Sequence, residues 1–252
     1  MYDFFLGGAH NFAVDRQLAE AIAAMTPDVG DTMRANRAFL RRVVRFLVGR
    51  GITQFLDIGS GIPTVGNVHE VARRADPASR VVYVDIDPIA VSHSRAILGD
   101  DPLTTVVEAD VRDADAVLEH PDTRRLLDLE RPVAVLLLGV LHFVPDEDRP
   151  AEIVARLRDA ISPGSYIALV NVTFEDQPPE VIEAQKLSSR TGTPIHLRSR
   201  AELAGQLAGL SLVEPGLVHL PLWRPDSPLD LDGRPERFGA LAGVGVKSPA
   251  PT

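Results

Sequence analysis

The residues with the clearest chemistry lie in Phe55–Thr64, an apolar run that leads into Gly59-Ser60-Gly61. Glycines allow a sharp turn, and a ligand can come close to their backbone because no Cβ is present. Asp57 stands just before the glycines, where its carboxylate suits the ammonium group of a cationic ligand. A Gly-x-Gly turn alone is weak evidence, since such turns also occur where a helix packs closely on a strand. It indicates a candidate nucleotide site that needs support from elsewhere.

Two further acidic residues follow other apolar runs. Asp85, next to Ile86, can accept hydrogen bonds from both hydroxyls of an adenosine ribose. A role of Asp85 as a helix cap is less favoured, because Asp87 is better placed for it. Asp110-Val111 comes later, and Asp110 can accept from an adenine amino group while a backbone N–H contacts a ring nitrogen. Taken alone, Asp110 is explained equally well as an ordinary acidic turn.

Two nucleotide cofactors fit this layout, a nicotinamide dinucleotide and S-adenosylmethionine. A dinucleotide favours a third glycine for its pyrophosphate, but Thr64 stands at that place with Pro63 before it. Proline has no N–H to donate, so a phosphate cradle is impaired. The carboxylate of Asp57 would repel a pyrophosphate and attract an ammonium. The pattern therefore favours S-adenosylmethionine.

Alternating strands and helices must position these residues. We predict helices over Met33–Arg50, Val65–Ala75, Pro88–Leu98 and Pro150–Ile161, and strands over Gln54–Ile58, Arg80–Ile86, Thr104–Ala109, Pro132–Leu138 and Tyr166–Val172. Repeated β-then-α units imply an α/β fold with a parallel sheet and right-handed crossovers. Such sheets bind ligands at the carboxyl ends of their strands, which is where the candidate residues fall.

The two ends of the chain differ from this middle part. We expect helices over Pro178–Arg190 and, after a Ser199 cap, over Arg200–Leu210. Leu212–Leu220 and Leu241–Val246 are predicted to form an antiparallel hairpin at the sheet edge. We treat residues 1–252 as a single domain, with an N-terminal helical lid over 1–50, a cofactor-binding core over 51–173, and substrate-side helices with the hairpin over 174–252.

Composition narrows the function classes. The 252 residues carry a net charge of −9, which argues against a broad nucleic-acid surface. The chain has no cysteine, which excludes thiolate metal sites and a cysteine nucleophile; the scattered histidines suggest no metal site either. Arg41, Arg42, Arg45 and Arg50 could form a local basic patch, although we favour the solvated face of a helix. No run is long enough to span a bilayer, so we expect a cytoplasmic protein with no membrane contact.

The motifs resemble a known family. Phe55–Thr64, Val84–Pro88 and Glu108–Asp113 are similar to the nucleotide-binding motifs of Rossmann-like methyltransferases. More narrowly, the chain resembles an actinobacterial family of S-adenosylmethionine-dependent methyltransferases, formerly a domain of unknown function, in Tyr2–Arg16, Asn36–Arg42, Leu138–Val144 and Thr193–Arg198. The resemblance covers essentially the whole chain. It implies a seven-stranded sheet whose last strand is antiparallel, with S-adenosylmethionine as cofactor and S-adenosylhomocysteine as product. It does not supply an acceptor.

Candidate residues around the transferred methyl group follow from the same segments. Gly139 and Val140 would line the donor pocket, with His142 beside them as a general base or, more simply, as a histidine that shapes the pocket. Tyr2, His10 and Asn11 could close over the cofactor as part of the lid. His196 and Arg198 could recognise a carboxylate on the substrate, although structural salt bridging is the favoured explanation.

The function indicated is methyl transfer to a small-molecule acceptor, by in-line displacement. A protein that binds S-adenosylmethionine without catalysis is the first alternative, because its cofactor motifs would be the same. An NAD(P)-dependent oxidoreductase is the second and is disfavoured by the missing third glycine. A homodimer is one assembly that the chain could form.

Overall fold

The computed structural model describes residues 2–5, 16, 20, 23, 28–62, 66–178, 182, 194–227 and 233–249. His10, Asn11, Pro63 and Thr64 lie outside the described residues, as does most of the helix predicted over 178–190. None of the helices in the described part of the chain is both long and apolar enough to cross a membrane.

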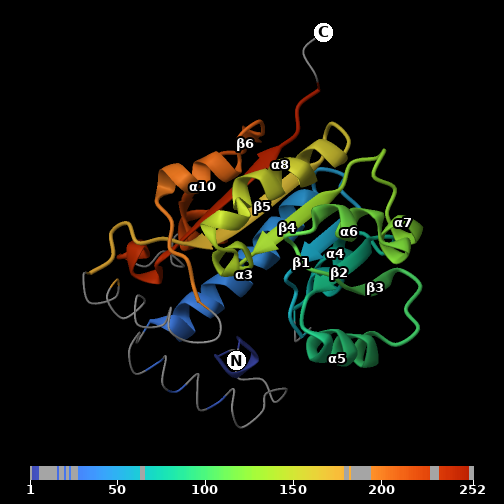
Figure 1. Ribbon diagram of the computed structural model, residues 1–252, viewed down its shortest axis with the longest axis horizontal. Coiled ribbons are helices and arrows are strands. Elements are labelled where there is room, and N and C mark those ends of the chain that lie inside the picture. The colour runs from blue at the N-terminus through green and yellow to red at the C-terminus, as the bar shows by residue number, and fades with distance from the viewer. Residues whose placement is uncertain are drawn as a thin grey trace.

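A mostly parallel sheet forms the centre of the molecule (Figure 1). The parallel strands are β3 (Thr104–Glu108), β2 (Arg80–Asp85), β1 (Gln54–Ile58), β4 (Ala134–Leu138) and β5 (Tyr166–Val172), in that spatial order. β8 (Ala240–Val246) follows beside β5 and runs antiparallel to it. These strands lie within one or two residues of the predicted bounds. The predicted fold class is confirmed, including the antiparallel last strand.

The edge of the sheet beyond β8 is interrupted. β6 (Ser211–Leu212) and β7 (Val218–His219) both pair antiparallel with β8. They must share one edge of β8, because β5 occupies its other edge along the whole strand. The predicted strand 212–220 is thus two short strands around a turn at Gly216, whose φ is +88°. The described sheet therefore has eight strands rather than seven.

Helices cover both faces of the sheet, and each face has its own apolar core (Figure 1). One face carries α3 (Val29–Val48), α4 (Val68–Ala75) and α5 (Pro88–Leu98), with the short α1 (Tyr2–Phe5) packed on α3. The other face carries α6 (Ala114–Glu119), α7 (Pro121–Leu126), α8 (Pro150–Ala160) and α10 (Arg200–Gln206). The predicted caps of two helices are confirmed: Asp87 accepts from the Ile89 amide, and Ser199 forms a capping box with Glu202.

The long helix α3 is fastened to the C-terminal part of the chain. Arg237 of η5 (Pro235–Phe238) pairs with Asp28 and Asp31 at the start of α3. Arg42 is buried and donates to the carbonyl oxygens of Trp223 and Leu220. Its assignment to a solvated helix face is therefore wrong, because the helix turns this arginine toward the C-terminal segment. These contacts fix where α3 crosses the carboxyl ends of the strands.

The other predicted arginines of this region stay closer to solvent. Arg45 pairs with Asp226, and both side chains are more than half exposed. The guanidinium of Arg50 lies over the ring of Phe46.

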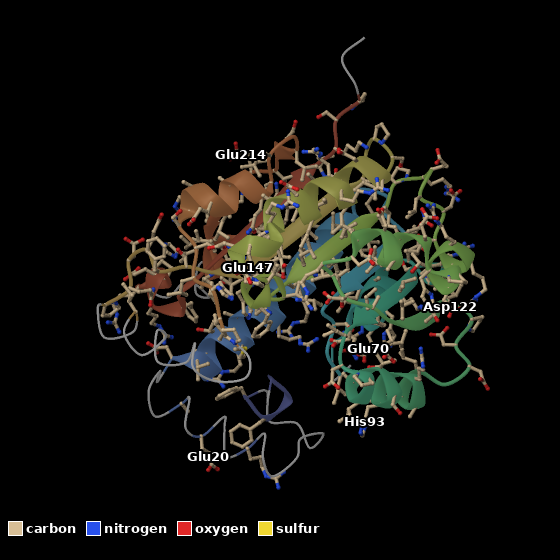
Figure 2. All side chains as sticks on the ribbon, viewed as in Figure 1. Glu20, Glu70, His93, Asp122, Glu147 and Glu214 are labelled. Carbon is tan, nitrogen blue, oxygen red and sulfur yellow. The ribbon has the colours of Figure 1, made fainter. Side chains whose placement is uncertain are left out.

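Acidic side chains are spread over different sides of the molecule, as Glu20, Asp122, Glu147 and Glu214 show in Figure 2.

Candidate cofactor and acceptor site

A cavity of about 600 Å3 lies at the carboxyl ends of the strands, beneath α3. Ligand pockets commonly measure roughly 300–1,000 Å3, so the cavity has the size of a binding site. Asp57, Gly59, Ser60, Gly61, Asp85, Gly139 and His142, all predicted from the sequence, line it. Open α/β sheets place their ligands at this edge because the turns after the strands converge there.

The two glycines after β1 do different work. Gly59 has φ +75°, and a Cβ built on it would lie 2.5 Å from the Cβ of Val140. This residue must therefore be glycine so that the turns after β1 and β4 can pack together. Gly61 has φ +61°, and a Cβ on it would meet nothing within 4 Å. The open space beside Gly61 belongs to the cavity, as expected where a ligand approaches the backbone.

Asp85 is held in place by the backbone. Its Oδ2 accepts the amide of Gly61 at 2.7 Å, and its Oδ1 accepts the amide of Asp87 at 3.0 Å. An ionised carboxylate offers about four acceptor positions. Two remain for a ligand, and the orientation is already fixed. This arrangement fits the two hydroxyls of an adenosine ribose.

Asp57 is the buried acid of the cavity. Its side chain is 6% exposed, and burial raises the pKa of its carboxyl to about 7, with the charge of Asp85 adding to the rise and that of Arg37 opposing it. A buried carboxyl of this kind gains by meeting a cation. The nearby guanidinium of Arg37, also in the lining, suits a carboxylate. Together they fit the amino-acid end of S-adenosylmethionine, which carries both charges.

Two lining residues of α3, Asn36 and Arg37, were not predicted individually from the sequence. Asn36 Nδ2 donates to the carbonyl oxygen of Leu138 at 3.1 Å, at the end of β4. Arg37 contacts Asn67 Oδ1 at 3.5 Å, before α4. Both residues lie in the segment 36–42 that resembles the methyltransferase family, and this resemblance was the signal in the sequence that could have identified them. Their place over the strands depends on the docking of α3, which local patterns do not reveal.

His142 lies in the wall of the cavity, on the 3-10 turn η1 (Leu141–Phe143) after β4. Burial, together with the charges of Arg198 and His196, lowers the pKa of its imidazole to about 4. The ring is therefore neutral at physiological pH. Its buried Nδ1 has no hydrogen-bond partner among the described residues. A neutral ring of this kind can orient a polar group of a ligand.

Several predicted contact residues lie beside the cavity rather than in its lining. Ile86 is 58% exposed after β2, and Val111 is part of the apolar core. Val140 packs against Gly59. Asp110 accepts from the amide and guanidinium of Arg112, so an adenine amino group would share that carboxylate. Of the lid, Tyr2 lies in α1, but its side chain is outside the described part of the chain.

Arg198 is buried under the loop that carries His142. It donates to the carbonyl oxygens of Leu141 at 2.8 Å and Val144 at 2.6 Å, and its ion pair with Asp146 measures 2.8 Å. The amide of His196 donates to the His142 carbonyl oxygen at 2.7 Å. Neither residue lines the cavity, and the guanidinium is fully engaged by the loop. The contacts indicate that Arg198 supports His142 instead of meeting a substrate.

These features define a methyltransferase of the Rossmann-like class, and comparison with known proteins gives the family. Residues 1–248 match the family model described as S-adenosyl methyltransferase. The chain belongs to this family, and its cofactor is S-adenosylmethionine. A search of the curated proteins found no match.

Solved structures agree with the family. The chain is similar to a Thermobifida fusca protein assigned to the methyltransferases, with 42% identity, a TM-score of 0.91, and coverage of 98% of this chain and 93% of that chain. It is also similar to a DUF574 family protein from Streptomyces avermitilis, with 40% identity, a TM-score of 0.92, and coverage of 98% and 95%. Human N-acetylserotonin methyltransferase in complex with its cofactor shares the fold at 14% identity and a TM-score of 0.55, over 99% of this chain and 63% of that one.

Proposed function

We propose that this methyltransferase transfers the methyl group to a small molecule, and that both reactants lie in the one cavity. The observation that carries the proposal is the composition of the cavity wall. The part at β1 and β2 holds Asp85 and Asp57 with Arg37 nearby, and the part at β4, β5 and β8 is lined mostly by apolar side chains, with His142 and Asn171 as its polar groups. A polar end for the cofactor and an apolar end for an acceptor are what a two-reactant site requires.

Three side chains would bind the cofactor. Asp85 accepts the ribose hydroxyls through the lone pairs that the backbone leaves free. Asp57 faces the ammonium and Arg37 the carboxylate of the amino-acid end. We keep Ile86, Asp110 and Val111 as predicted neighbours of the adenine ring, and Tyr2, His10 and Asn11 as predicted lid contacts.

When bound, S-adenosylmethionine would supply a methyl group attached to a positively charged sulfur. The residues of the chain then have two tasks, to align the lone pair of the acceptor with the carbon–sulfur bond and to exclude water. Gly139 and Val140 form the turn beside the reacting centre. The neutral imidazole of His142 orients the acceptor. We propose it as a general base only for an acceptor that loses its proton during attack.

Calorimetry with S-adenosylmethionine, S-adenosylhomocysteine, NAD and NADP tests the proposal. We expect binding of the two adenosyl compounds and no heat from the dinucleotides. Binding of NAD without a response to S-adenosylmethionine would overturn it. A cytoplasmic location, a homodimer and the absence of nucleic-acid binding stay predictions, which fractionation, sedimentation and a gel-shift assay can check.

A further inference from the structure

The wall of the cavity changes in character along the sheet. Three of its charged lining residues among those described, Asp57, Asp85 and Asp87, lie on β1 or at the end of β2, and the fourth, Arg37 of α3, contacts Asn67 before α4. At the other end, across β4, the lining comes from β5, β8 and η3 (Leu220–Leu222), and the described side chains there are uncharged: Val170, Asn171, Val172, Leu220 and Ala240. The second half is therefore poorly suited to an ion, because a charge loses its hydration there without gaining a counter-charge.

Besides Tyr83 of β2, two phenylalanine rings border the same cavity, each from a different element. Phe5 belongs to α1 and Phe143 to η1. The ring of Phe143 is 41% exposed. Met33 and Leu40 of α3 add further apolar surface to the lining. Aromatic side chains beside an apolar pocket favour a flat ring as ligand, since stacking adds to the burial of apolar area.

Two buried polar atoms in this half, on Asn171 and His142, lack a hydrogen-bond partner among the described residues. Asn171 of β5 is fully buried, and its Oδ1 accepts the amide of Val172 at 2.9 Å. Its Nδ2 makes no hydrogen bond to the described residues. Buried donors are normally satisfied, so an unpaired one in a cavity wall calls for an acceptor atom from a ligand or from water. The unpartnered Nδ1 of His142, in the same lining, has the same requirement.

We propose that the methyl acceptor is an uncharged, largely apolar ring compound with an oxygen that accepts a hydrogen bond from Asn171. The inference rests on the proposed function, because it takes the half at β1 and β2 as the cofactor's place. The ring lies against Phe143 and the apolar side chains of α3. Its oxygen completes the hydrogen bonding of the Asn171 amide.

Three probes of nearly the same shape test the charge preference: benzamide is neutral, benzoate is an anion and benzamidine is a cation. The protein is first saturated with S-adenosylhomocysteine, and the probes are then titrated by NMR. We expect benzamide to bind at least about tenfold more tightly than either charged probe. Equal or tighter binding of a charged probe would overturn the inference, and so would no binding of benzamide up to its solubility limit.

Two variants show where the probe binds. Phe143→Ala is expected to weaken benzamide about tenfold, through loss of ring contact. Phe174→Ala is the matched control, since Phe174 is 39% exposed and is not in the cavity lining. An equal effect of both substitutions would contradict the assignment.

Asn171→Asp replaces the amide donor by a carboxylate of the same shape. It should weaken benzamide and strengthen benzamidine, while the affinity for S-adenosylhomocysteine stays unchanged. An unchanged order of the three probes in this variant would overturn the role of Asn171. Failure of S-adenosylhomocysteine itself to bind the wild-type protein would instead contradict the proposed function.

Discussion

The two halves of the cavity satisfy their polar groups in opposite ways. At β1 and β2, Asp85 is already held by two backbone amides, and Asp57 lies near the charge of Arg37. At β4 and β5, the buried Nδ2 of Asn171 and Nδ1 of His142 have no partner among the described residues. The chain itself therefore orients Asp85 before any ligand binds, whereas we propose that a ligand completes the hydrogen bonding of Asn171 and His142.

Substitution of Gly59, in the turn after β1, is expected to have the largest effect on stability. Gly59→Ala should lower the free energy of unfolding by about 2–5 kcal/mol, because its Cβ would overlap Val140 and the backbone has a positive φ. Gly61→Ala meets no atom and should cost only about 1–2 kcal/mol of backbone strain. It should, however, weaken S-adenosylmethionine binding, because Gly61 lines the cavity. Urea unfolding and calorimetry on both variants separate packing from binding, and equal stability losses would contradict the distinction.

Arg198→Ala should loosen the acceptor half alone. The carbonyl oxygens of Leu141 and Val144 lose their donor, and we expect a loss of about 2–4 kcal/mol in the free energy of unfolding. Affinity for S-adenosylhomocysteine should stay within about twofold, since Arg198 does not reach the cofactor half. Arg125→Ala breaks an exposed pair with Asp122 and should cost at most about 1 kcal/mol. A larger effect of Arg198→Ala on cofactor affinity than on stability would contradict its role as a support.

Asp85→Ala should weaken the cofactor half by about 1–3 kcal/mol in binding of S-adenosylmethionine, the range for hydrogen bonds to a charged group. Asp113→Ala is the control, because Asp113 caps α6 and does not line the cavity. It should lower stability by about 1 kcal/mol without changing affinity. Unchanged affinity in a folded Asp85→Ala protein would mean that the ribose lies elsewhere.

Asp57 predicts a pH dependence confined to the cofactor half. In the free protein burial raises the pKa of Asp57 to about 7, so the carboxyl is protonated below that pH. An ammonium requires the ionised form, and binding of S-adenosylmethionine should therefore weaken by up to about tenfold per pH unit as the pH falls below 7. Calorimetry between pH 5.5 and 7.5 checks this. Asp57→Asn should bind weakly with a flat profile, and a retained slope would assign the proton to another group.

The comparison of the two halves also explains what the sequence could predict. Strand β5 was predicted with the observed bounds, because a strand buried between β4 and an antiparallel neighbour reads as a continuous apolar run. Asp57 and Asp85 lie at the carboxyl ends of β1 and β2, and Gly59 and Gly61 follow β1, so local pattern and chain order place all four residues. The cofactor half could therefore be predicted from the sequence pattern of two β-then-α units.

The acceptor half depends on contacts between distant segments. Arg42 was expected on a solvated face, but it is buried against the C-terminal segment and donates to the carbonyl oxygens of residues 220 and 223. Arg198 lies next to the loop at 141–146 only because residues 194–198 pass beneath that loop. Asn171 reads as an irregularity in an apolar strand. Local periodicity does not predict contacts between distant segments, because these contacts depend on tertiary packing.

A crystal structure with S-adenosylhomocysteine tests the division of the cavity most directly. We predict the ribose hydroxyls within hydrogen-bonding distance of Asp85, the amino-acid end between Asp57 and Arg37, and the sulfur facing the turn at Gly139. The half at β5 and β8 would then be left free for the acceptor. Adenosine in the half at β5 and β8, or an amino-acid end away from both Asp57 and Arg37, would contradict the account.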